Sequence, residues 1–145
     1  MKILFVTLLL ISTSSLADPY DKLRQISLSE VASYSASVKA DLAKETPQQI
    51  VEKGKKTIAD ILKDPESAQF RKVRLVQYLD GAVVCGEINA KNSYGGYVGF
   101  SDFVGGTNSA TMRNSDGEYP DITAVANTGI DIACSGNPYI PAEKP

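Results

Sequence analysis

The sequence predicts an α+β fold, in which N-terminal helices pack on a small antiparallel β-meander of three to four strands and a short helix follows near the C-terminus. Apolar residues recur at helical spacing over residues 28–62. Alternating and β-branched residues dominate residues 70–88, on both sides of a turn signal. Helices that are segregated from consecutive strands are typical of a sheet with helices on one face.

The first two helices are predicted by capping-box patterns. Residues 27–30 read SLSE, which predicts a helix start, and residues 18–26 either extend this helix or form a looser lead-in. Residues 46–49 read TPQQ and predict a second helix with Pro47 at its first position. Gly54 lies in the apolar stripe of that helix, where glycine costs about 1 kcal/mol relative to alanine, so we expect a close approach by a neighbouring backbone.

The dipeptide Asp80-Gly81 separates two strand-like runs and is a strong signal for a β-hairpin. If these two residues form the loop, counting outward places Arg74 opposite Glu87 and Val73 opposite Ile88. The first pair joins opposite charges and the second joins two β-branched residues, which favours this register.

Glycine and β-branched residues predict the rest of the meander. Residues 95–100 are interpreted as a third strand whose glycines mark a bulge or a close backbone approach, and residues 107–112 as a fourth strand. Residues 121–134 approximate helical spacing around an interruption at residues 127–129 and predict a short helix. The tail from about residue 136 is rich in proline and small residues, which is typical of irregular structure.

Residues 1–17 have the organisation of a bacterial secretory signal peptide. They combine Lys2, a short apolar run, and the small residues Ser15 and Ala17 before a predicted cleavage site. The apolar run is shorter than the about 20 residues that span a bilayer. We therefore expect residues 18–145 to form a single domain with no membrane span after cleavage, and a periplasmic or secreted localisation.

The composition excludes several classes of function. The 145 residues contain no histidine, which excludes Ser-His-Asp and Cys-His catalytic sites and metal sites with histidine ligands. Two cysteines cannot form a four-cysteine zinc or iron–sulfur site. The net charge of −2 provides no basic field, so we expect no nucleic-acid partner. We assign no catalytic residue, no metal site and no cofactor, and we favour a protein that is not an enzyme.

Cys85 and Cys134 are the first candidates for chemistry. In an exported chain an even pair of cysteines predicts a disulfide, which is the interpretation we favour. The alternative is a nucleophilic Cys85 near Glu87 and Arg74, but that arrangement lacks a histidine base. A third, minor alternative is a pair of buried free cysteines.

Residues 85–103 form the most distinctive stretch of the chain, because aromatic residues alternate there with glycines. Its loop residues are candidates for binding a sugar, a peptide or a partner protein, and packing of a curved strand pair is the structural alternative. The candidate binding residues are Asn89, Lys91, Asn92, Tyr94 and Tyr97.

Two segments of the chain resemble a family of small exported bacterial and phage-borne proteins that has no assigned activity. The segments are DPESAQFR at residues 64–71 and VCGEINAKNSYGGYVGF at residues 84–100. The resemblance covers roughly residues 55–104, with Cys134 as a further point of similarity. It implies an exported compartment and the architecture above, and it carries no functional residue over to this chain.

The leading functional hypothesis is a small exported, non-catalytic protein of the bacterial envelope that binds a macromolecular partner, for example a periplasmic inhibitor or immunity protein. One alternative is a glycan or small-ligand binding protein that uses Tyr94 and Tyr97. Another is a carboxylate-based hydrolase of envelope polymers, which needs two acidic residues such as Glu87 and Asp102 in one cleft. The sequence predicts no oligomeric state.

Overall fold

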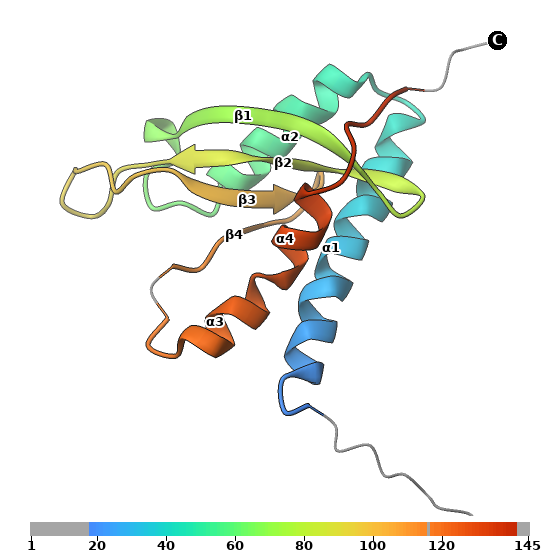
Figure 1. Cartoon of the computed structure of the whole chain (residues 1–145). Helices are drawn as coiled ribbons and strands as arrows, with labels where there is room; N and C mark the ends of the chain where they lie inside the picture. Colours follow the sequence, from blue (N-terminus) through green and yellow to red (C-terminus); the bar gives the residue numbers. More distant parts are fainter. Residues whose placement is uncertain (1–17, 116, 142–145) are drawn as a thin grey trace, which may run out of the picture.

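The computed structural model of this protein describes residues 18–115 and 117–141, and the predicted signal peptide lies outside them. The fold is α+β, as predicted (Figure 1). The elements in chain order are α1 (Asp21–Leu42), α2 (Pro47–Ala59), the short 3-10 helix η1 (Pro65–Ser67), β1 (Gln69–Tyr78), β2 (Gly81–Asn89), β3 (Ser101–Gly105), β4 (Ala110–Met112), α3 (Pro120–Ala126) and α4 (Thr128–Cys134).

The four strands form an antiparallel meander in the order β1-β2-β3-β4, with helices on both of its faces (Figure 1). Successive residues of a strand point to opposite faces. In β2, Val84 packs in a cluster with Ile58 of α2, whereas Val83 packs in a second cluster with Ile130 of α4. The expectation of helices on one face was therefore incomplete, because the C-terminal helix returns to the other face.

Helix α1 begins at Asp21, so residues 21–26 extend the helix while residues 18–20 precede it, and the predicted helix start at residues 27–30 was wrong. Ser27 is buried inside the helix. Its hydroxyl donates a hydrogen bond to the carbonyl of Ala126 (3.0 Å) and accepts one from the amide of Gly129 (2.8 Å). The side chain of Ser27, which the sequence pattern marked as a helix cap, therefore binds α3 and α4 instead.

Helix α2 begins as predicted, with Thr46 and Gln49 forming a reciprocal capping box. Gly54 also makes a close approach, although to a side chain instead of a backbone. A Cβ atom at Gly54 would lie 2.7 Å from Cγ2 of Val84. The missing side chain lets α2 lie directly against β2.

The hairpin between β1 and β2 forms where predicted, but its register was predicted wrongly. Leu79 and Asp80 form the loop, and Tyr78 pairs with Gly81. Gly81 faces α1 closely, because a Cβ atom there would lie 2.6 Å from the carbonyl oxygen of Ser35. The absence of a side chain at Gly81 therefore allows close packing against α1. In the turn itself it is Leu79 that has a positive φ, of 53°.

The new register changes the partners of the charged residues in β1. Arg74 faces Cys85 instead of Glu87. A bulge lies between Arg71 and Arg74, and beyond it Arg71 pairs with Glu87. The expected opposite-charge pair therefore exists, but with a different arginine.

The third strand was also misplaced, because β3 begins at Ser101 and residues 95–100 belong to the preceding loop. Gly95 and Gly99 have left-handed φ values of 80° and 103°, which are incompatible with a regular strand. Strand β4 falls within its predicted range, and the predicted C-terminal helix consists of α3 and α4.

The described part of the tail is irregular but is held on the outer edge of β1. The amide of Gln77 donates to the carbonyl of Asn137 (2.9 Å), and the amide of Tyr139 donates to the carbonyl of Leu75 (3.1 Å). These bonds cover part of an edge strand that would otherwise expose its backbone groups.

Candidate functional site

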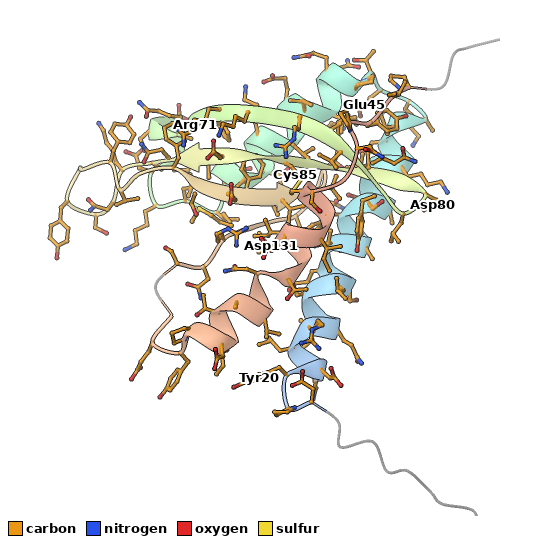
Figure 2. All side chains as sticks on the ribbon, in the orientation of Figure 1. Tyr20, Glu45, Arg71, Asp80, Cys85 and Asp131 are labelled. Atoms are coloured by element: carbon orange, nitrogen blue, oxygen red, sulfur yellow. A yellow bond between two sulfur atoms is a disulfide. The ribbon has the colours of Figure 1, made fainter. Side chains whose placement is uncertain are left out.

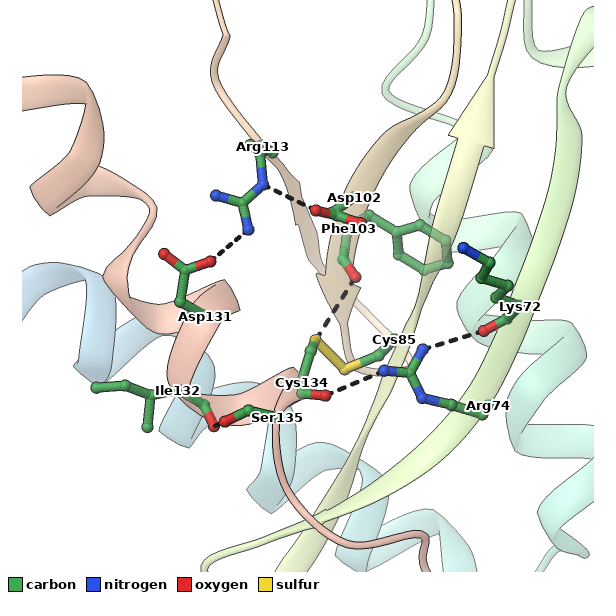
Figure 3. Close-up of a disulfide and its surroundings, with 10 residues drawn as sticks. All are labelled: Lys72, Arg74, Cys85, Asp102, Phe103, Arg113, Asp131, Ile132, Cys134 and Ser135. Carbon is green, nitrogen blue, oxygen red and sulfur yellow. Dashed lines mark hydrogen bonds and ion pairs between the residues drawn. A yellow bond between two sulfur atoms is a disulfide. The ribbon is translucent and has the colours of Figure 1, made fainter. Parts of the chain in front are cut away.

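The structure joins Cys85 and Cys134, the pair that the sequence analysis favoured, in a disulfide between β2 and the end of α4 (Figure 3). Their Cα atoms lie 5.8 Å apart, and Cys85 is fully buried. Arg74 donates a hydrogen bond from Nη2 to the carbonyl of Cys134 (3.0 Å). Within residues 18–115 and 117–141 no cysteine is free, so the structure offers no thiol nucleophile there.

Charged side chains form a row across the sheet on the face of α4, beyond the disulfide. The row consists of Arg71 in β1, Glu87 in β2, Asp102 in β3 and Arg113 after β4. Nε of Arg71 lies 2.7 Å from Oε2 of Glu87, and Nε of Arg113 lies 2.9 Å from Oδ2 of Asp102. Arg113 also forms an ion pair with Asp131 of α4 (Figure 3).

The row brings Glu87 and Asp102 directly opposite each other, which is the juxtaposition that a carboxylate-based hydrolase would need. A glycosidase also needs one carboxyl group with a raised pKa to act as general acid. Here the hydrogen bond from Arg71 lowers the pKa of Glu87, and a second hydrogen bond from Lys72 acts in the same direction. Glu87 is therefore held ionised, which suits an ion-pair network better than proton transfer.

The five candidate binding residues all lie in or beside one loop, residues 90–100, which we call the aromatic loop. Its tip is a tight hairpin turn. The amide of Gly95 donates to the carbonyl of Asn92 (3.0 Å), and the amide of Asn92 donates to the carbonyl of Gly96 (2.9 Å). The side-chain oxygen Oδ1 of Asn92 accepts from the amides of Tyr94 (2.9 Å) and Gly96 (3.1 Å). Asn92 therefore shapes the turn with its side chain.

The base of the aromatic loop is fixed by further hydrogen bonds. Oδ1 of Asn89, which is buried, accepts from the amide of Gly99 (2.9 Å). Ser67 of η1 accepts at its hydroxyl from the amide of Lys91 (2.9 Å) and at its carbonyl from the hydroxyl of Tyr97 (3.1 Å). Three of the predicted residues, Asn89, Asn92 and Tyr97, thus hold the loop in one conformation.

Large apolar side chains on this fixed loop face the solvent. The exposed fraction is 97% for Tyr94, 70% for Val98, 45% for Tyr97 and 37% for Phe100. The guanidinium carbon of Arg71 lies 3.9 Å from the ring centroid of Phe100, a cation–π distance. Arg71 and the loop lie at the end of the sheet opposite Asp80 (Figure 2).

A groove of about 790 Å³ lies between the aromatic loop, the chain after α2 and the end of β4. Its exposed apolar side chains include Ile61, Val98 and Met112. Ile61 and Met112 were absent from the sequence prediction, since they lie far from the loop along the chain and belong to ordinary apolar patterns. The groove's charged residues are Lys63, Glu87, Lys91, Asp102 and Arg113.

Comparisons of this chain with protein-family models, curated proteins and solved structures found no match. None of the helices in the described ranges is long and apolar enough to cross a membrane.

Proposed function

We propose that this is a small exported, non-catalytic protein of the bacterial envelope that binds a macromolecular partner through the aromatic loop. One observation carries the proposal: Tyr94 and Val98 are exposed on a loop whose backbone is held by hydrogen bonds from its tip to its base. Large apolar side chains that are exposed on one short loop are typical of interaction surfaces.

The rigidity of the loop supports binding in energetic terms. Association normally costs free energy because side chains and loops become ordered at the interface. A loop that is already ordered avoids much of this cost, and tyrosine is enriched among the residues that dominate interface energies. Tyr94, at the tip, is placed to make such a contact.

The compartment in this proposal is the periplasm or the extracellular space. The signal-like residues 1–17 and the cysteine pair at disulfide distance support it. The specific form that we propose is an inhibitor or immunity protein that covers part of a toxin or a wall-degrading enzyme. An inhibitor of this kind can bind its target through a rigid loop and does not need to catalyse a reaction.

Site-specific photo-crosslinking in the producing cells tests the proposal. A photoreactive amino acid replaces Tyr94 in one variant and Ile26 of α1, 48% exposed, in a matched control. We expect a discrete adduct from position 94 and none from position 26. Absence of adducts at position 94, in a variant that retains the Cys85–Cys134 disulfide on non-reducing gels, would contradict a role for the loop in binding.

A further inference from the structure

We propose that the groove beside the aromatic loop receives an acidic segment of the partner protein that carries an apolar side chain. This inference rests on the proposed function and specifies the chemistry of the partner. It follows from the charges that remain uncompensated in the groove, from its apolar lining and from the cations that lie over the rings of Phe100 and Tyr97 in the aromatic loop.

The carboxylates that line the groove already have cationic partners. Glu87 is engaged by Arg71 and Lys72, whose side-chain nitrogens lie 2.7 and 3.2 Å from its Oε2 atom. Asp102 is engaged by Arg113, at 2.9 Å. Arg113 also pairs with Asp131, so this network of three cations and three carboxylates carries no net charge.

The two lysines that line the groove, Lys63 and Lys91, are not neutralised by a carboxylate among the described residues. Nζ of Lys63 donates a hydrogen bond to the neutral hydroxyl of Ser93 (2.8 Å), and Nζ of Lys91 lies 5.7 Å from the ring centroid of Tyr97. Neither lysine has an ion pair with a carboxylate of residues 18–115 or 117–141. Counted over its described lining residues and their ion-pair partners, the groove is thus locally positive in a chain of net charge −2, which favours an anionic occupant.

The apolar part of the groove requires an apolar group on the same occupant. Ile61, Val98 and Met112 come from three different segments and expose aliphatic or thioether surface to it. The volume of about 790 Å³ lies in the range of about 300–1,000 Å³ that is typical of binding clefts. A peptide segment with carboxylates beside an aliphatic or aromatic side chain satisfies both parts of the groove.

A protein segment fits this groove better than an anionic glycan. A sugar ring stacks on a free aromatic face, but the guanidinium of Arg71 lies over the ring of Phe100 and the ammonium of Lys91 lies over that of Tyr97. The hydroxyl of Tyr97 is also engaged, by the carbonyl of Ser67. The polar and stacking groups that a glycan would use are thus partly occupied.

Peptide display against the purified, disulfide-intact protein tests this inference. We expect selected sequences to carry Asp or Glu beside aliphatic or aromatic residues. A labelled synthetic peptide of the consensus should bind in fluorescence anisotropy, more weakly as salt rises. The double variant Lys63→Glu/Lys91→Glu should weaken that binding about tenfold or more. The control Lys22→Glu/Lys44→Glu makes the same change in net charge away from the groove and should leave binding unchanged.

Several results would overturn the inference. They are a selection without any binding sequence, a consensus that lacks acidic residues, an equal loss of affinity in both double variants, and preferential binding of an acidic polysaccharide such as polygalacturonate. Crosslinking at Tyr94 separates this failure from failure of the proposed function. If the adducts persist unchanged in the Lys63→Glu/Lys91→Glu variant, the aromatic loop does bind a partner, but an acidic segment in the groove is not needed for that binding.

Discussion

Removal of the covalent link between β2 and α4 should destabilise the fold strongly. The disulfide joins positions that are 49 residues apart. In the chain-entropy model, closing a loop of that size in the unfolded state contributes about 4 kcal/mol to stability. Domains typically have only about 5–15 kcal/mol in total, so the double variant Cys85→Ala/Cys134→Ala should be marginally stable.

Urea unfolding followed by circular dichroism measures this loss. The double variant should unfold at a much lower urea midpoint than the oxidised wild type, and wild type treated with a reductant should shift in the same direction. Mass spectrometry of the exported protein without reductant should find Cys85 linked to Cys134. Two alkylatable thiols in that sample, or equal midpoints for variant and oxidised wild type, would refute the reasoning.

Two further predictions concern the contacts of β2. Gly54→Ala should lower the free energy of unfolding by up to about 2 kcal/mol, because the clash with Val84 (about 1–3 kcal/mol) exceeds the gain in helix propensity (about 1 kcal/mol). The same substitution in a Val84→Ala background should cost less, and an equal cost would disprove the contact. Glu87→Gln should lower the urea midpoint at neutral pH. Arg71 lowers the folded-state pKa of Glu87, so its stabilisation exists above the unfolded-state pKa and is lost as the pH falls through the folded value. A difference between variant and wild type that does not shrink at acidic pH would contradict this.

Local signals predicted the elements whose residues interact mainly with their own neighbours along the chain. The capping box from Thr46 to Gln49 predicted the start of α2, since both partners lie in one turn. The pattern SLSE at residues 27–30 failed because Ser27 finds its hydrogen-bond partners in Ala126 and Gly129, about 100 residues away. A local pattern cannot report a partner at that separation.

The five candidate binding residues lie close together in the structure, but they have different roles there. We selected them because the composition of residues 85–103 is unusual, and all five lie in or beside the aromatic loop, although Tyr97 was predicted to lie in a strand. Their roles differ, since the side chains of Asn89 and Asn92 bind loop backbone while Tyr94 faces the solvent. The pattern Asn-x-x-Gly from Asn92 to Gly95 is the local signal for this turn, where the sequence predicts a tight polar loop.

The sequence by itself determined the α+β class and the approximate position of the hairpin, because these depend on the local order of apolar, glycine and turn residues. Only the tertiary structure decided the strand register and the groove. The hairpin turns at Leu79 and Asp80, where Gly81 packs closely against Ser35 of α1, and the bulge between Arg71 and Arg74 then pairs Glu87 with Arg71 instead of Arg74. Such contacts join residues far apart along the chain, and their geometry exists only once α1, α2 and the sheet have packed together.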